Sequence, residues 1–374
     1  MRIFAPQLGL NPDSSSGGEI YDVEILAGLA KRGHDVDVLL RKGQKAPNVK
    51  NMHVHYLPFS INTVAYNILF TPWLFRIPSI KKLVQKADIF RVHSPYFIGL
   101  GAVLCKKTIK GCSKLWFHYH HIEDQLKMKA FDKILPKYSD GITIDTGTTL
   151  DDLKRLCPDV KTKKHISTIA PGTDIEIFKP MHPDIGIKKS LNIRNDEKIV
   201  LYVGHLIHRK GIDVLMDSWK NIRRDFDDVH LILIGRGPFE TLVREHQKND
   251  NKIHIVPYVP TQRDLAKYYN ACDVFAFPTR LEGHGMTAAE AMACEVPVVT
   301  TNAKGIRNVV VDGKTGYKVN IDDTKQFSSK LEILLSNDSL RKNMGSAGRR
   351  FIKENFTWEA AIDKLEVFME NMTA

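Results

Sequence analysis

Short runs of apolar, mostly β-branched residues recur along the chain, and stretches with the three-to-four-residue periodicity of amphipathic helices separate them. In the first half these runs predict strands at 3–5, 36–40, 54–57, 89–92, 115–118, 141–144 and 166–169. In the second half they predict strands at 199–203, 231–234, 253–256, 274–277 and 298–300. Strands that alternate with helices favour parallel sheets with crossover helices, so the pattern predicts an α/β fold.

This alternation is interrupted once, at residues 178–183. The stretch has the prolines and the polarity of a linker, and the strand–helix alternation restarts after it. We therefore predict two Rossmann-like domains, residues 1–180 and 181–357, with a cleft between them. Ligands of such sheets bind at the carboxyl ends of the strands, so the cleft is the expected site. Residues 358–374 carry apolar side chains at spacings of three and four and predict a final amphipathic helix.

The composition is that of a globular protein, with 43% hydrophobic and 26% charged residues in a chain of 374. No apolar run reaches the roughly 20 residues that a membrane-spanning helix needs. The first residues, 1–5, are interpreted as a strand and not as a signal peptide. The five cysteines form no Cys-x-x-Cys pair, which suits a reducing cytoplasm and argues against a disulfide framework or a zinc site.

The net charge of +11 is concentrated in the first half of the chain. Residues 1–180 hold 26 basic and 17 acidic residues, whereas the remainder holds 28 and 26. An anionic substrate, an anionic membrane surface or a nucleic acid would each explain such an excess. No nucleic-acid motif accompanies the charge, so we predict that nucleic acid is not a partner.

The most informative motif is the segment 282–290, which begins and ends with glutamate and opens with a Gly-x-Gly turn before a predicted helix. Backbone N–H groups at such a turn, together with the helix dipole, form a site for an anion. Glu282 precedes the turn, and Glu290 lies about one helical turn inside, on the face next to the anion. A phosphate between two carboxylates suits a nucleotide-sugar. The alternative is a strand–turn–helix corner with solvated carboxylates, because this spacing alone is a weak signal.

A basic pair, Arg209 and Lys210, follows the first predicted strand of the second half, where a loop that begins at Gly204 turns into a helix. Arginine binds phosphate through paired hydrogen bonds, and lysine adds a point charge. Both would neutralise the charge of a departing nucleoside diphosphate. The ordinary alternative is two solvated basic side chains.

Two features of the first half also lie at strand ends. Gly17 and Gly18 follow helix-capping residues after the first strand, and their N–H groups could approach a phosphate, although an ordinary capped helix explains them equally well. His118, His120 and His121 end the strand at 115–118. Adjacent residues of an extended strand face opposite sides, so the three rings cannot all converge, and we predict no metal site. His93 ends another strand and is a weaker candidate.

Residues 62–86 combine apolar and aromatic side chains with a basic cluster. The basic residues are Arg76, Lys81, Lys82 and Lys86. This composition suits a segment that contacts an anionic lipid surface. The alternative is a core segment between strands, in which Pro72 and Pro78 interrupt any long helix.

In this order, the Gly-Gly turn, the basic pair and the E-x7-E segment make the chain resemble the retaining glycosyltransferases of the GT-B fold, of the family 4 or group 1 type. The resemblance extends over nearly the whole chain. It implies that the final helix, 358–374, crosses back onto the first domain. It also implies that a nucleoside-diphosphate sugar binds to the second domain and that the acceptor binds to the first.

The resemblance assigns roles to the motif residues. Arg209, Lys210 and the N–H groups after Glu282 would take the diphosphate. Glu282 would contact the sugar, and Glu290 would hold the ribose hydroxyls. Because protein groups bind the diphosphate, neither a metal ion nor another cofactor is expected.

From the first domain, His120 would approach the reactive carbon of the sugar together with the Gly17–Gly18 loop, with His118 as the second choice. Other residues expected near the donor are Gly204, Gly235, Arg236, Tyr258, Val259, Leu265, Gly283, His284, Gly285, Met286 and Thr287. For Tyr258, an ordinary core position is an equally good interpretation.

Three positions depart from the family pattern. His284 stands where many relatives have phenylalanine, which could alter donor preference, and Thr173 alters the usual hinge tetrad. Glu295 stands where most relatives have glycine. Because a non-glycine residue is costly in the left-handed region, Glu295 argues against a left-handed backbone at that position.

We therefore expect an enzyme that moves a hexose from a UDP- or GDP-linked donor to an acceptor glycan, a lipid-linked glycan or a phospholipid. The expected location is the cytoplasm, with peripheral attachment to the cytoplasmic face of the membrane. The alternatives are a transferase for a soluble sugar acceptor, a sugar-nucleotide epimerase and a non-catalytic nucleotide-sugar-binding module. The basic pair together with the two glutamates argues against the last two.

Overall fold

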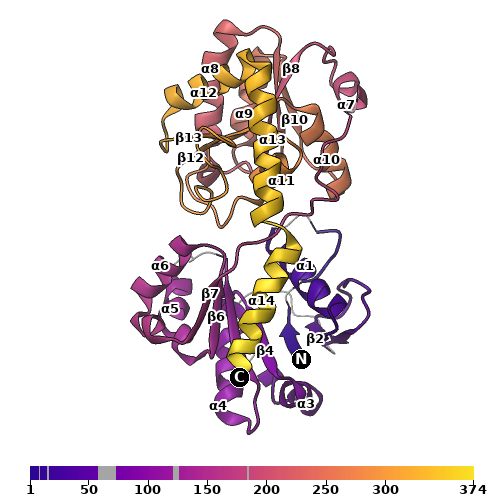
Figure 1. The fold of residues 1–374 in the computed structure, drawn as a ribbon, viewed down its shortest axis with the longest axis vertical. Coiled ribbons are helices and arrows are strands. Elements are labelled where there is room, and N and C mark those ends of the chain that lie inside the picture. Colours follow the sequence, from indigo (N-terminus) through magenta and orange to yellow (C-terminus); the bar gives the residue numbers. More distant parts are fainter. Residues whose placement is uncertain (8, 15–16, 58–72, 121–125, 183–184) are drawn as a thin grey trace. The chain divides into compact units, whose positions relative to one another are not determined.

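The computed structural model describes residues 1–7, 9–14, 17–57, 73–120, 126–182 and 185–374 (Figure 1). The chain forms two compact units, one of Met1–Gly172 with Trp358–Ala374 and the other of Thr173–Thr357. The linker-like stretch at 178–183 predicted a division after residue 180. The structure places it after Gly172, because residues such as Phe178 are buried in the core of the second unit.

The first unit contains a sheet of seven parallel strands in the order β3-β2-β1-β4-β5-β6-β7. The strands are β1 (Arg2–Pro6), β2 (Asp35–Leu40), β3 (Met52–Tyr56), β4 (Ile89–His93), β5 (Lys114–Tyr119), β6 (Gly141–Ile144) and β7 (His165–Thr168). The described helices are α1 (Gly17–Lys31), α3 (Pro78–Lys86), α4 (Pro95–Thr108), α5 (Leu126–Ile134), α6 (Gly147–Leu156) and α14 (Trp358–Thr373). The direction of strand addition reverses between β1 and β4, which is where ligands of such sheets bind.

The second unit contains a sheet of six parallel strands in the order β10-β9-β8-β11-β12-β13. The strands are β8 (Lys198–Val203), β9 (Val229–Ile234), β10 (Ile253–Val256), β11 (Val274–Phe277), β12 (Val298–Thr301) and β13 (Gly316–Val319). The helices are α7 (Ile185–Ser190), α8 (Ile212–Asp225), α9 (Glu240–Asn249), α10 (Gln262–Ala271), α11 (Met286–Ala293), α12 (Thr324–Ser336) and α13 (Asp338–Asn355). Here the order reverses between β8 and β11.

The predicted strands are all present. Within the described ranges, the one strand that the hydrophobic pattern missed is β13, whose sequence Gly-Tyr-Lys-Val contains no apolar run. It pairs with β12 through backbone hydrogen bonds at the edge of the sheet, a position that demands no hydrophobic signature.

The final helix, α14, belongs to the first unit and packs on α1. Its apolar face is buried, as the spacing predicted. Gly28 permits the close approach of the two helices, since a Cβ atom there would lie 2.1 Å from Cδ1 of Ile362. Phe368 packs against Trp116 of β5, with ring centroids 5.7 Å apart. None of the helices in the described ranges has the length and hydropathy needed to span a bilayer.

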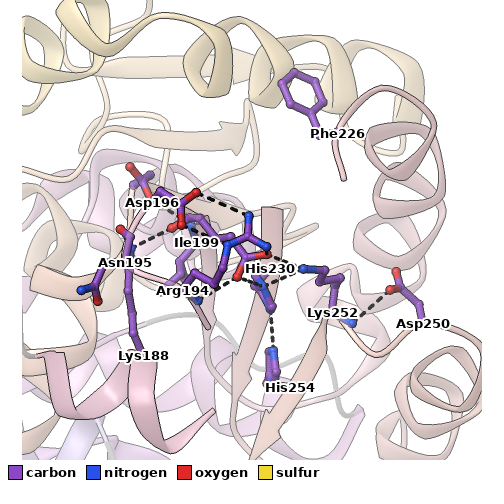
Figure 2. A network of polar contacts seen from close by, with 12 residues as sticks. Lys188, Arg194, Asn195, Asp196, Ile199, Phe226, His230, Asp250, Lys252 and His254 are labelled. Carbon is purple, nitrogen blue, oxygen red and sulfur yellow. Dashed lines mark hydrogen bonds and ion pairs between the residues drawn. The ribbon is translucent and has the colours of Figure 1, made fainter. Parts of the chain in front are cut away.

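A polar network ties together the amino ends of β8, β9 and β10 (Figure 2). At its centre is the buried Glu197, which accepts hydrogen bonds from Lys252 at 2.5 Å and from the amide of Arg194 at 2.8 Å. His230 lies 3.2 Å from the same carboxylate and 2.8 Å from His254. In a parallel sheet this edge is opposite to the carboxyl ends, so the network supports the fold and lies away from the expected ligand site.

Candidate active site

The E-x7-E segment and the basic pair meet at the point where the second sheet reverses its strand order. The basic pair follows β8 and Glu282 follows β11, and these strands are neighbours although Lys210 and Glu282 are 72 residues apart in sequence. Because the strands are parallel, both loops leave from the same edge of the sheet. The topology therefore brings together two motifs that the sequence could only note separately.

Lys210 and Glu282 form a buried ion pair between Nζ and Oε1. Oγ1 of Thr279 lies 3.1 Å from the same carboxylate oxygen, and the lysine ammonium lies 5.1 Å from the centroid of the Phe277 ring. Each charge compensates the other, and removing either partner would leave an uncompensated buried charge.

Arg209 is exposed beside this pair and ties the two loops together. Its Nη1 donates to the carbonyl of Leu281 at 2.9 Å, and its own carbonyl accepts from the amide of Arg280 at 2.8 Å. Gly211 ends the basic loop in the left-handed region, with φ of 70°. A Cβ atom there would lie 1.9 Å from the carbonyl oxygen of Pro278, so glycine allows the two loops to approach this closely.

Helix α11 begins directly after the Gly-x-Gly turn, and no side chain caps its first turn. Gly283 and His284 lead into Gly285, which has φ of 89° and precedes Met286 and Thr287, the first two helical residues. The first N–H groups of a helix have no intrahelical acceptor. The anion site predicted from the sequence depends on these N–H groups and on the helix dipole.

Glu290 lies on the buried side of α11 and accepts a hydrogen bond of 2.9 Å from the hydroxyl of Tyr269. Burial raises the pKa of Glu290 to about 7, and the hydrogen bond from Tyr269 opposes this shift only in part. The sequence analysis missed Tyr269. It lies at the end of α10, and no pattern in the sequence connects it with a glutamate 21 residues away.

The glycines Gly204, Gly235 and Gly237 pack two neighbouring loops on each other. A Cβ atom on Gly235 would lie 1.9 Å from the carbonyl oxygen of Gly204, and one on Gly237 would lie 2.3 Å from that of Leu206. Both positions therefore exclude any side chain. This close packing explains the Gly-x-Gly sequence after β9 without a ligand.

The predicted wall of the nucleotide site follows β9 and β10. Arg236 is exposed, and its guanidinium lies 6.0 Å from the centroid of the Tyr258 ring. Tyr258 is 51% exposed, so the alternative that it is a core residue is wrong. Val259 and Leu265 are half-buried against the hydrophobic core. Tyr258 thus offers an accessible aromatic face beside a cation.

Two departures from the family pattern have structural consequences. The buried ring of His284 packs against Phe356, with centroids 5.1 Å apart. Glu295 adopts φ of 62°, so the expectation that a non-glycine residue would prevent a left-handed backbone there is wrong. The conformation is held by the bond from its amide to the carbonyl of Met292 and by Gly345, whose missing side chain leaves room for the carbonyl of Glu295.

In the first unit, the predicted residues gather at the carboxyl ends of β1, β4 and β5. Gly17 and Gly18 open α1, and an ideal Cβ on Gly18 would lie 3.7 Å from Nε2 of His120. His120 directly follows β5, and His93 ends β4. His118 is fully buried behind His120, where its ring stacks on Tyr21 at 4.3 Å. Ser15, Ser16 and His121 lie outside the described residues.

Asp145, which follows β6, contacts both His118 and His120 and was not singled out from the sequence. Its carboxylate lies 2.6 Å from Nδ1 of His120 and 3.3 Å from Nε2 of His118. An acidic residue directly after the predicted strand 141–144, beside the strand that carries the histidines, was the signal that could have identified it. A second acidic residue, Asp22 of α1, pairs with His93 at 2.5 Å and with the buried Arg91 at 2.7 Å.

The two histidines beside Asp145 differ in their pKa values. Burial lowers the pKa of His118 to about 3, and the nearby carboxylate does not offset this. For His120 burial also acts to lower the pKa, but the charge and hydrogen bond of Asp145 outweigh it and raise the pKa above 6.5. Burial acts to raise the pKa of Asp145, but the two histidines hold it well below its usual value. The cluster therefore favours a charged His120 beside a carboxylate.

His118, His120 and Asp145 also form the group of side chains, among the described residues, whose donor atoms are close enough together to hold a metal ion. Within this group, Nε2 of His118 lies 3.4 Å from Nδ1 of His120, and that nitrogen lies 2.6 Å from Oδ2 of Asp145.

Comparisons with known proteins agree with this geometry. The family model for "Glycosyl transferases group 1" matches residues 185–351, and the model for "Glycosyltransferase Family 4" matches residues 15–177. The D-inositol 3-phosphate glycosyltransferase of Xylanimonas cellulosilytica is 31% identical over 95% of this chain and 92% of its own length.

One further relative matches part of the sequence, and one solved structure matches the fold over nearly the whole chain. The GDP-mannose-dependent alpha-(1-6)-phosphatidylinositol monomannoside mannosyltransferase of Mycolicibacterium smegmatis is 34% identical over 44% of this chain and 45% of its own length. The structure of sucrose-phosphate synthase from Thermosynechococcus elongatus superimposes with a TM-score of 0.84 at 20% identity and covers 99% of this chain and 98% of that one.

Two parallel α/β units of this kind define the GT-B architecture, and the chain belongs to the group 1 glycosyltransferases. It is a transferase enzyme.

Proposed function

We propose that this enzyme transfers a hexose, with retention of anomeric configuration, from a UDP- or GDP-linked donor to a hydroxyl group of a lipid-linked glycan or phospholipid. The observation that carries the proposal is the buried Lys210–Glu282 pair beside the uncapped start of α11, with Glu290 one turn further on. Cations, free N–H groups and carboxylates at one switch point match the groups of a nucleotide-sugar.

In this proposal the diphosphate binds to Lys210, Arg209 and the N–H groups of residues 283–287. Lys210 then shares its charge between the phosphate and Glu282, which contacts the sugar hydroxyls. Glu290 accepts hydrogen bonds from the ribose. Tyr258, beside Arg236, lies against the base. Because these protein groups compensate the diphosphate charge, the reaction requires no metal ion.

During transfer, the acceptor oxygen forms a bond to the anomeric carbon while the bond from that carbon to the donor phosphate breaks. The departing phosphate oxygen takes the proton of the acceptor hydroxyl. Lys210 and Arg209 stabilise the negative charge that develops on the nucleoside diphosphate. His120 and the Gly17–Gly18 turn contact the sugar and the acceptor.

The lipid acceptor is supported by the charge and exposure of the first unit. Trp73 is 65% exposed and lies beside Arg76, whose guanidinium is 5.4 Å from the centroid of the indole ring.

Helix α3 buries Ile80 and Val84 and exposes basic side chains. The exposed lysines are Lys81, Lys82 and Lys86. An exposed indole with neighbouring cations suits an anionic membrane surface. Residues 62–72 of the predicted segment lie outside the described residues. The mycolicibacterial relative, by its name, acts on a phosphatidylinositol glycolipid.

A soluble phosphorylated acceptor is the second candidate. The Xylanimonas relative, which matches nearly the full chain, is named for D-inositol 3-phosphate. The basic excess of residues 1–180 would favour such an anionic acceptor as well.

The donor is tested by thermal unfolding with UDP, GDP, ADP and TDP in turn, because a ligand of the native state raises the midpoint. A shift with UDP or GDP alone is the expected result and defines the donor class. Transfer is then assayed with the matching sugar nucleotides, using acceptor lipid in anionic vesicles and, separately, soluble sugar phosphates. Strong transfer to the soluble acceptor without vesicles would favour the second candidate.

We expect Lys210→Ala and Glu290→Ala each to reduce transfer by two or more orders of magnitude, since each removes a group that contacts the donor. Lys220→Ala is the matched control. It removes an exposed lysine of α8 that pairs with Asp217 at 3.0 Å, and it leaves the site intact. Near-normal turnover of both site variants would contradict the assignment.

A further inference from the structure

A chain of hydrogen bonds leads from Trp116 to His120. It determines which ring nitrogen of His120 carries a proton and where each nitrogen points. It begins at Trp116, whose indole N–H donates to Oγ1 of Thr143 at 2.7 Å. An indole nitrogen can only donate, so the threonine oxygen accepts this bond. The threonine hydroxyl proton remains available for Nδ1 of His118, which lies 2.9 Å away.

The next link follows from the position of Asp145. Nε2 of His118 lies 3.3 Å from Oδ1 of Asp145 and 3.4 Å from Nδ1 of His120, so the carboxylate oxygen is its nearer and charged neighbour. A bare nitrogen lone pair against a carboxylate would be repulsive, so Nε2 carries the proton and Nδ1 accepts from Thr143. The low pKa of His118 agrees with a neutral ring of this tautomer.

The other carboxylate oxygen accepts from His120. Its Nδ1 lies 2.6 Å from Asp145, and a contact this short requires a proton on that nitrogen. The other ring nitrogen of His120 is Nε2. It has no hydrogen-bond partner among the described residues, and it faces Gly18 at the start of α1.

We propose that Asp145 is a positioning residue of the transferase, which fixes His120 with Nδ1–H toward the carboxylate and Nε2 toward the Gly17–Gly18 turn. Trp116 and Thr143 orient His118, whose Nε2 lies against the second carboxylate oxygen of Asp145. The substrate group opposite Nε2 is a hydroxyl or another oxygen of the sugar or acceptor. The inference rests on the proposed function, in which His120 contacts the substrate.

The tautomers can be measured without substrate. Long-range 1H–15N spectra of the full chain labelled with 15N-histidine distinguish Nδ1–H from Nε2–H, and His120→Gln identifies the signal of His120. The expected result is a proton on Nδ1 of His120 in the wild-type chain. A neutral Nε2–H ring there would overturn the proposal, and this measurement needs no substrate.

The first test variant is Asp145→Asn. An asparagine offers one acceptor and one donor group to two N–H donors, so the tautomers can no longer both be kept. We expect an altered tautomer pattern and a lower titration midpoint for His120. The matched control is Asp37→Asn, since Asp37 pairs with His55 at 2.9 Å in the same sheet. The control should change His55 and leave the signals of His120 unchanged.

Kinetic constants distinguish an Asp145 that positions His120 from an Asp145 that only stabilises the fold. Asp145→Asn should lower kcat by roughly 10–100-fold, because a misoriented ring loses its contact with the reacting groups. The Kd for the nucleotide should change by less than about twofold, since the nucleotide groups belong to the second unit. An unchanged kcat despite altered tautomers would overturn the proposal. If no donor supports turnover even in the wild type, the proposed function fails, and the spectra still decide how His120 is held.

Discussion

At the scale of single residues, Glu290 is the group whose chemistry depends most on its surroundings. It is buried on α11, and its pKa of about 7 means that it is half protonated near neutral pH. Only the carboxylate can accept hydrogen bonds from both ribose hydroxyls. The proposed donor site is therefore expected to respond to pH in the physiological range.

We predict that affinity for the nucleotide falls as the pH falls. The pKa of the free protein is raised, so the carboxylate is lost below about pH 7, and the Kd should rise about tenfold between pH 8 and pH 6. Calorimetric titrations across this range measure the effect. Glu290→Gln should bind more weakly at pH 8 and show only the pH dependence of the nucleotide itself. Parallel pH profiles for both proteins would contradict the prediction.

Lys210 and Glu282 illustrate a second residue-scale point. Each is buried, and each charge would be costly without the other, so their contact stabilises both. In the proposed function, the donor diphosphate competes with Glu282 for the lysine.

At the scale of elements, the end of α11 contains a strained residue. Glu295 occupies the left-handed region, which costs a non-glycine residue roughly 1–2 kcal/mol. Its side chain recovers part of this through the bond that Ser346 donates at 3.2 Å.

Glu295→Gly should therefore stabilise the second unit by about 0.5–1 kcal/mol, as the release of backbone strain exceeds the loss of an exposed hydrogen bond. Chemical denaturation monitored by circular dichroism measures the change. Glu295→Ala is the control, because it removes the same side chain and keeps the strain. It should be neutral or destabilising, and an equal gain from both variants would show that the side chain, not the backbone, is responsible.

The network at the amino ends of β8, β9 and β10 is a second element-scale feature (Figure 2). Burial acts to raise the pKa of Glu197, but the bonds from Lys252, Arg194 and His230 outweigh it and lower the pKa to about 2. A lowered carboxyl pKa stabilises the folded chain above the ordinary value of 4.5, and this contribution is lost as the pH falls toward 2.

We predict that Glu197→Gln lowers the free energy of unfolding at pH 7 by on the order of 1–3 kcal/mol, because it leaves Lys252 without its anion. The loss should shrink as the pH is lowered from 5 to 3, where the wild type loses the same interaction. The control is Asp196→Asn next to it, which alters only an exposed pair with Arg194. Denaturant unfolding curves at several pH values test both, and equal effects of the two variants would refute the special role of Glu197.

At the scale of the whole molecule, the chain leaves the first unit at Gly172 and returns to it at Trp358. The first unit is therefore complete only after the last helix has been added. Its stability should depend on the packing of α14, whereas the core of the second unit, formed within residues 173–357, should not.

Phe368→Ala is expected to destabilise the first unit by about 3–5 kcal/mol, since it empties a buried site against Trp116. Hydrogen exchange followed by mass spectrometry should show faster exchange in β1 to β7 and unchanged protection in β8 to β13. Val367→Ala, on the exposed side of the same helix, is the control. Uniform loss of protection in both sheets would contradict independent units.

The sequence by itself determined the α/β class, the strands with strong apolar runs, and the final amphipathic helix, because hydrophobic periodicity is local information. It also pointed to both glutamates and the basic pair, since motif spacing is equally local. The edge strand β13 was missed because it forms through backbone pairing with β12, and its side chains show no strand pattern. The end of the first unit was misplaced because Phe178 joins a core built from residues far along the chain.

Only the tertiary structure decided which residues meet. The order of the strands and the packing of the helices joined Lys210 to Glu282, Tyr269 to Glu290, and Asp145 to His118 and His120. The tertiary structure also holds Glu295 in a left-handed backbone conformation, because Gly345 leaves room for the carbonyl of Glu295. Contacts between residues distant in sequence depend on sheet topology, and topology is a property of the folded chain that no local pattern carries.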